Sequence, residues 1–160
     1  MVTDASNRII QVNQSLLQML GYQEDEVLGN TPAMFASGRH EPAFYQQMWQ
    51  QLTEQGHWQG EVWNRRKNGE VYPELLSINS ILDASQQVSH YVAVFADITQ
   101  LKASEQELAY LAHHDVLTDL PNRLLMSSRL QNAVDLAKRD QHQFAVLMMD
   151  LDRFKYINDS

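Results

Sequence analysis

Two aspartates near the end of the chain have the spacing of a cation site. Asp150 and Asp152 close the apolar run of residues 144–149, which predicts a strand over residues 144–150. Side chains alternate along a strand, so both carboxylates would face the same side. Such a pair suits Mg²⁺, a hard cation that takes oxygen ligands and shares them with phosphates. On spacing alone, a solvated strand end followed by a helix is the simpler alternative.

The residues that follow extend this chemistry toward a nucleotide. Lys155 can balance phosphate charge, and Asn158 has an amide that can pair with the edge of a base. Together with the two aspartates, they favour a site for a magnesium–nucleotide complex.

Composition excludes several other classes of protein. The 160 residues carry 12 lysines and arginines against 20 aspartates and glutamates, a net charge of −8 that argues against nucleic acid as a partner. The absence of cysteine removes disulfides, thiolate metal sites, cysteinyl-flavin photochemistry and covalently attached haem. No apolar run approaches the roughly 20 residues of a membrane span, and the first residues are not expected to act as a secretory leader. We therefore expect a cytoplasmic location, in a parent protein that is either free or membrane-tethered.

The chain divides by composition into a front and a tail. All six glycines and all three tryptophans lie within the first 69 residues, as expected of a small mixed domain rich in turns and large apolar anchors. Strands are predicted over residues 8–13, 58–66, 70–81 and 88–96, and the main helix over residues 41–55. The sequence Lys67-Asn68-Gly69 predicts a hairpin turn, and the basic run before it is interpreted as charge that protects an edge strand. This order predicts an α+β fold, an antiparallel sheet with helices on one face.

A helix is expected to leave this domain after Asp97-Ile98-Thr99, whose side chains can cap it. No helix breaker follows until Pro121. Apolar residues recur near heptad positions, which favours a short parallel coiled coil in a homodimer; a surface helix packed on its own domain is the alternative. The heptad residues are Ile98, Leu101, Leu108 and Leu111.

The front of the chain resembles a PAS sensory domain. The matches, in order, are Thr3-Asp4, Ile9-x-x-x-Asn13, Gly21-Tyr22, Glu26-Val27-Leu28-Gly29, Gly56-x-Trp58-x-Gly60-Glu61, Asn64-Arg65-Arg66-Lys67-Asn68-Gly69-Glu70 and Asp97-Ile98-Thr99. The resemblance implies a sensory domain over residues 1–98, with a first strand that is clipped, and a signalling helix or linker over residues 99–114. Asp97 and Thr99 would relay the state of the domain to that helix.

The resemblance also implies a ligand pocket between the sheet and the helix of residues 41–55. Trp49, Trp58 and Asn64 stand where some FAD-binding PAS domains carry similar residues, and an aromatic wall with an amide suits an isoalloxazine ring. The alternatives are a small metabolite or no ligand, with the tryptophans as core anchors. Haem is not expected, because the interior of that helix contains no histidine to serve as an axial ligand.

The tail resembles the opening of a GGDEF diguanylate cyclase domain over residues 113–160. The matching residues are His113-His114-Asp115-x-Leu117-Thr118-Asp119-Leu120-Pro121-Asn122-Arg123 and Asp150-Leu151-Asp152-Arg153-Phe154-Lys155-x-Ile157-Asn158-Asp159-Ser160. Such domains condense two GTP molecules into cyclic di-GMP.

Family roles carry over to individual positions. Asp150 would bind Mg²⁺ through its carboxylate and Leu151 through its backbone carbonyl, while Lys155 would contact the triphosphate and Asn158 the guanine. In the connector, Asp119 and Arg123 would tie the turn to the cyclase domain and complete the signal relay.

The glycine-rich signature loop that names the GGDEF family is not found in these 160 residues. We therefore expect residues 115–160 to be the N-terminal fragment of an incomplete α/β domain, a helix plus one strand. Residues 121–160 are expected to pack poorly, or only against another copy, and the chain itself is not expected to make cyclic di-GMP. The predicted function is a sensory and dimerisation module whose parent is a diguanylate cyclase that uses Mg²⁺ and GTP. The alternatives are residual Mg-GTP binding or cyclase activity through a swapped dimer, an FAD-binding redox sensor, and a scaffold that only dimerises.

Overall fold

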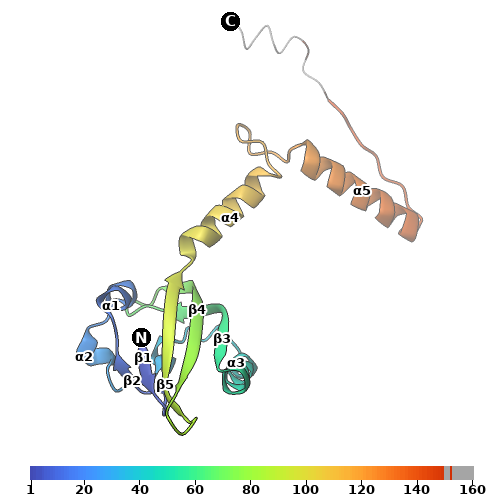
Figure 1. Ribbon diagram of the computed structural model, residues 1–160. Coiled ribbons are helices and arrows are strands. Elements are labelled where there is room, and N and C mark those ends of the chain that lie inside the picture. Colours follow the sequence, from blue (N-terminus) through green and yellow to red (C-terminus); the bar gives the residue numbers. More distant parts are fainter. Residues whose placement is uncertain (150–151, 153–160) are drawn as a thin grey trace, which may run out of the picture. The chain divides into compact units, whose positions relative to one another are not determined.

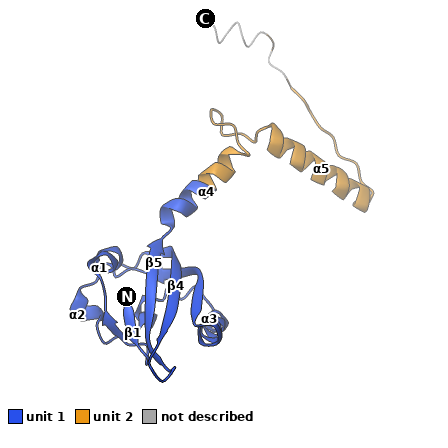
Figure 2. Ribbon diagram, in the orientation of Figure 1, with its two compact units in different colours: residues 1–105 blue, residues 106–160 orange. Residues whose placement is uncertain are grey.

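The computed structural model describes residues 1–149 and 152, and the chain divides into two units, residues 1–105 and 106–160 (Figure 2). The first unit contains five strands and four short or medium helices ahead of an exit helix (Figure 1). In chain order these elements are β1 (Val2–Asp4), β2 (Ile9–Gln11), α1 (Gln14–Leu20), α2 (Glu24–Val27), the 3₁₀ helix η1 (Pro32–Phe35), α3 (Pro42–Gln55), β3 (His57–Arg65), β4 (Val71–Leu82), β5 (Val88–Asp97) and α4 (Thr99–Leu111).

The five strands form one antiparallel sheet in the order β2-β1-β5-β4-β3. The β3–β4 hairpin closes around the predicted turn, where Arg65 pairs with Val71 and Gly69 has φ of 91°. A positive φ costs glycine little, which explains the Asn-Gly pair at this turn. The fold is therefore the predicted α+β arrangement, although β2 is shorter than the strand expected over residues 8–13.

One face of the sheet is buried under the helices. From Glu74 onward along β4, Glu74, Leu76 and Ile78 are buried while Leu75 is 36% exposed; the preceding Tyr72 and Pro73 are both buried. This alternation is the period of two expected of a sheet with one covered face. Two adjoining apolar clusters occupy that face, one with α1, α2 and η1 and the other with α3. Their buried members are Ile9, Leu16, Leu17, Leu20, Val27, Phe35 and Tyr72 in the first, and Met48, Leu52, Trp58, Val62, Leu76, Ile78 and Ala93 in the second.

Local sequence fixes the placement of α3 on the sheet. The helix begins with Pro42 and ends at Gly56, which has φ of 76° and donates its N–H to the Leu52 carbonyl. The chain then enters β3, where the Trp58 ring packs directly over Gly60. A Cβ at position 60 would lie 2.6 Å from Trp58 Cζ2, so the absence of a side chain there makes room for the indole.

The second unit contains the end of α4 and the helix α5 (Arg123–Asp140). Asn122 caps α5 through its side-chain oxygen, and the Tyr110 hydroxyl donates to Asp119 Oδ1 at 2.6 Å across the connecting turn. The prediction of a strand over residues 144–150 is wrong for residues 144–149, which have no regular secondary structure; Asp150 lies outside the described residues. A strand needs a partner for its backbone groups, and no described segment pairs with this one. Among the described residues, no helix is both long and apolar enough to span a membrane.

Candidate ligand pocket and exit helix

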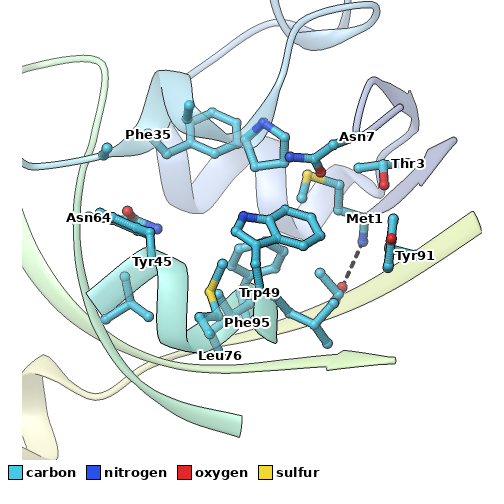
Figure 3. Close-up of a pocket in the computed structure, with 17 residues that line it drawn as sticks. Met1, Thr3, Asn7, Phe35, Tyr45, Trp49, Asn64, Leu76, Tyr91 and Phe95 are labelled. Atoms are coloured by element: carbon cyan, nitrogen blue, oxygen red, sulfur yellow. Dashed lines mark hydrogen bonds between the residues drawn. The ribbon is translucent and has the colours of Figure 1, made fainter. Parts of the chain in front are cut away.

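A cavity of about 280 Å³ lies between the sheet, α3 and η1 in the first unit (Figure 3). Its volume is near the lower end of small-molecule sites, roughly 300–1,000 Å³. Most of the wall is apolar, and Trp49 of α3 lies at the centre of the view. The lining residues are Met1, Thr3, Asn7, Pro32, Ala33, Phe35, Ala36, Tyr45, Met48, Trp49, Val62, Asn64, Leu76, Ile78, Tyr91, Ala93 and Phe95.

Polar side chains in this wall include those of Thr3, Asn7, Tyr45, Asn64 and Tyr91. Thr3 Oγ1 and the Tyr45 hydroxyl are buried and have no hydrogen-bond partner among the described residues. Asn64 lines the cavity from β3, and Figure 3 shows it at the end opposite Thr3. A buried polar atom without a partner costs about 1–3 kcal/mol. The cavity therefore has an apolar middle and a hydrogen-bonding group at each end.

Behind Asn64 lies a fully buried carboxyl group. Asn64 Nδ2 donates to Glu74 Oε1 at 2.7 Å, and the Tyr72 hydroxyl donates to Glu74 Oε2 at 2.6 Å. Burial raises the pKa of Glu74 to about 7, although both hydrogen bonds oppose the shift. Burial and the nearby Glu74 charge also raise the pKa of Tyr45.

Arg66 connects this group to the end of β5. Its guanidinium lies 3.9 Å from the centre of the Tyr72 ring, pairs with Asp97, and donates to the Met19 carbonyl at 2.6 Å. Asp97 in turn accepts from the Thr99 backbone N–H at 2.8 Å, at the first residue of α4. Burial alone would raise the pKa of Asp97, but hydrogen bonds from Thr99 and Arg66 outweigh it and hold the pKa below its ordinary value. A chain of contacts thus runs from the cavity wall to the exit helix.

The structure separates the three residues that the sequence indicated for the pocket. Trp49 and Asn64 line the cavity, whereas Trp58 lies in the second apolar cluster with its ring edge-on to Phe44. Sequence reasoning missed Thr3 and Tyr45. The Tyr45 hydroxyl becomes a candidate ligand-binding group only when the structure places it in the cavity wall.

Glu74 and Arg66 were also missed as functional residues. The alternation along β4 places residue 74 on the buried face, so a glutamate there is the available sequence signal for a buried polar group. Arg66 is not simply edge protection, because its side chain is only 15% exposed and bridges three segments.

Most of the site residues indicated by the sequence in the tail are not among the described residues. Asp150, Leu151, Lys155 and Asn158 lie outside the described residues, and Asp152 is exposed. Within residues 1–149 and 152, no three histidine, aspartate or glutamate side chains gather into a group that could hold a metal ion.

In the connector, Asp119 has φ of 61° and accepts from Tyr110, whose ring stacks on His114 with 4.0 Å between centres. Arg123 is the first residue of α5.

Comparison with known families agrees with the two parts of the chain. Residues 1–100 match the PAS domain family, and residues 112–160 match part of the family described as diguanylate cyclase, GGDEF domain. The chain belongs to the PAS domain family and continues into a partial GGDEF domain.

Two curated relatives are described as diguanylate cyclases. The chain is 46% identical over 83 residues to the bifunctional diguanylate cyclase/cyclic di-GMP phosphodiesterase MucR of Pseudomonas aeruginosa, covering 52% of this chain and 12% of the relative. It is 29% identical over 162 residues to the probable diguanylate cyclase DgcE of Escherichia coli, covering 98% of this chain and 14% of the relative. The chain therefore spans less than one sixth of the length of each of these relatives.

Among solved structures, a light-oxygen-voltage domain from work with a flavin analogue is similar with a TM-score of 0.55 and 25% identity. The similarity covers 66% of this chain and 85% of that domain.

Proposed function

We propose that residues 1–98 form a sensory domain that binds a small planar ligand and reports its presence through α4. The observation that carries this proposal is the pair of buried, unpartnered hydroxyls of Thr3 and Tyr45 in a mostly apolar cavity. Since burying them without a partner is unfavourable, a ligand that bonds to both would stabilise the domain.

A flavin ring is the ligand that we favour. Trp49 supplies an aromatic wall, and Asn64, Tyr45 and Thr3 supply hydrogen bonds at the two ends of the cavity. The similar light-oxygen-voltage domain comes from work with a flavin analogue, which supports this class. A bound flavin would supply reversible redox chemistry. The chain's own residues would bind the ring, orient it, and exclude water. A metabolite of similar shape is the alternative.

The output of the domain passes through residues 99–114. Leu101, Leu108 and Leu111 are 56%, 67% and 41% exposed on α4, which favours their burial in a parallel coiled coil with a second copy. The Arg66–Asp97 pair would transmit strain from the sensory domain to the start of this helix.

The intact protein is proposed to be a cytoplasmic diguanylate cyclase whose catalytic domain begins at residue 115. In that domain Asp150 and Leu151 would hold Mg²⁺, while Lys155 and Asn158 would bind GTP. Asp119 and Arg123 would fix the connector to the domain. This part rests on the GGDEF match and on the diguanylate cyclase relatives.

Absorbance and native mass spectrometry of one freshly purified sample test the ligand. The visible bands of an oxidised flavin with a matching mass increment are expected in wild type, and both should be lost in a Tyr45→Phe, Asn64→Leu double variant. Protein that retains the mass of the bare polypeptide after incubation with FAD and with lumiflavin would contradict a flavin ligand.

A further inference from the structure

The hydrogen bond between Asn64 and Glu74 determines which way the Asn64 amide faces. Glu74 is fully buried on β4, directly behind the cavity wall, and Asn64 is 7% exposed. Among the described residues, the Asn64 side chain makes one hydrogen bond, from its Nδ2 to Glu74 Oε1. Its carbonyl oxygen receives no hydrogen bond from any described residue.

The ionised form of Glu74 makes this orientation obligatory. An ionised carboxylate only accepts hydrogen bonds, so the group that faces it must be a donor. In that form the NH₂ end of Asn64 is committed to Glu74, and the amide oxygen is left for a ligand in the cavity. A neutral carboxyl keeps this arrangement when its proton is on Oε2, where Oε1 is still an acceptor.

We propose that Glu74 is a positioning residue that sets the hydrogen-bonding polarity of the pocket and so selects ligands that carry an N–H donor at the Asn64 end. It does so without lining the cavity. This inference rests on the proposed function, because it concerns the ligand that the cavity binds.

The Tyr45 hydroxyl narrows the ligand class further. It is buried, has no hydrogen-bond partner among the described residues, and belongs to a residue that lines the same cavity as Asn64. A ligand that bonds to both residues carries an N–H for the Asn64 oxygen and a second polar group, such as a C=O, for the Tyr45 hydroxyl. A planar heterocycle with a lactam or imide edge carries both groups.

The isosteric substitution Glu74→Gln is expected to reverse the amide. Among the described residues, the Tyr72 hydroxyl donates only to the side chain at position 74, so the glutamine oxygen is expected to turn toward Tyr72 and keep that hydroxyl paired. Its NH₂ group then faces Asn64, which must present its oxygen to that group and its own NH₂ to the cavity. The variant therefore offers a donor where wild type offers an acceptor, with little change in volume.

Lumiflavin and its N3-methylated derivative are probes that differ in this one donor. Binding is measured by flavin fluorescence and titration calorimetry at pH 8, with Glu54→Gln on the exposed side of α3 as the matched control. We expect wild type and Glu54→Gln to prefer lumiflavin by about tenfold or more. Glu74→Gln should still bind lumiflavin, but its preference for lumiflavin over the N3-methylated derivative should fall below about threefold. An unchanged preference in Glu74→Gln would overturn the proposal.

Nuclear magnetic resonance of the ligand-free protein gives a readout that does not depend on the probes. The side-chain NH₂ signal of Asn64, identified by its loss in Asn64→Asp, should exchange slowly with solvent in wild type and faster in Glu74→Gln. Fast exchange in wild type would overturn the positioning role. Slow exchange without binding of either flavin would support the Asn64–Glu74 hydrogen bond. It would contradict a flavin ligand and overturn the proposal that Glu74 selects ligands with an N–H donor.

Discussion

Arg66 and Asp97 form an ion pair that joins the β3–β4 hairpin to the end of β5. Asp97 is the last residue of β5 and lies two residues before Thr99, where α4 begins. The same guanidinium stacks on Tyr72, which donates to the buried Glu74. A change at the cavity wall therefore has a short route to the exit helix, through side chains that are in direct contact.

Replacement of Asp97 by asparagine tests the strength of this connection. Asparagine can still accept from the Thr99 N–H, so the loss is confined to the charged pair with Arg66. We expect the free energy of unfolding to fall by about 1 kcal/mol. Urea unfolding measures this change, and hydrogen exchange should show faster opening of the first turn of α4. Asp25→Asn, at an exposed site on α2, should leave both unchanged, and an equal effect of the two substitutions would contradict the role of the pair.

The raised pKa of Glu74 predicts a particular pH dependence of stability. With a pKa of about 7 in the folded protein and 4.5 as its ordinary value, the folded state holds a proton that the unfolded state has released. Stability contributed by Glu74 is therefore present at low pH and lost as pH rises through 7.

The charged and titratable neighbours of Glu74 ionise outside this range, since Tyr45 and Tyr72 have raised pKa values, Asp97 a lowered one and Arg66 stays protonated. Between pH 5 and 8 the free energy of unfolding of wild type should fall by about 1–3 kcal/mol relative to Glu74→Gln. Chemical unfolding across this range measures the difference. Histidine titration is common to both proteins and cancels. Parallel curves for the two proteins would show that Glu74 does not ionise in this range.

The contact between Trp58 and Gly60 predicts a strong effect of a single methyl group. A Cβ at position 60 would overlap the indole ring, so Gly60→Ala must displace Trp58 from the second apolar cluster. We expect a loss of about 1–3 kcal/mol in the free energy of unfolding, together with a shift in tryptophan fluorescence. Gln59→Ala, at the exposed neighbouring position of β3, serves as the control. If Gly60→Ala had the stability of wild type, the close packing of the Trp58 ring against Gly60 would not be needed for the fold.

The exposed leucines of α4 predict a dimer that can be separated from the fold. Leu108 is 67% exposed in the single chain, so Leu108→Lys should leave the thermal unfolding of the sensory domain unchanged. In a coiled coil the same change buries a charge, and the dissociation constant should rise about tenfold or more. Sedimentation equilibrium provides the measurement, with Glu107→Lys as the charge control. Equal association of both variants would place the interface elsewhere.

Periodicity and turn chemistry were sufficient to predict four of the five strands and the helix α3, whereas β1 was indicated only through the family resemblance. The Asn68-Gly69 turn depends on a few neighbouring residues and was therefore readable. The strand expected over residues 144–150 was not found over residues 144–149, because an apolar run becomes a strand only when another strand completes its hydrogen bonds.

The cavity was only partly predictable. Trp49 and Asn64 were identified through resemblance, whereas Thr3 and Tyr45 come from distant segments that meet only in the folded domain. Glu74 can be identified as a functional residue only from the structure, which shows its hydrogen bond with Asn64. In the sheet Asn64 is paired with Tyr72, so its hydrogen bond to Glu74 is a diagonal cross-strand contact that the periodicity of a single strand does not specify.

Hydrogen exchange of residues 97–105, with and without lumiflavin, tests most directly whether this domain senses a ligand. The account predicts increased protection of the cavity segments of β1, α3 and β3 on binding, together with a change in exchange at the first turns of α4. Protection of the cavity with no change over residues 97–105, in protein shown to be saturated, would contradict the claim that occupancy of the pocket reaches the exit helix.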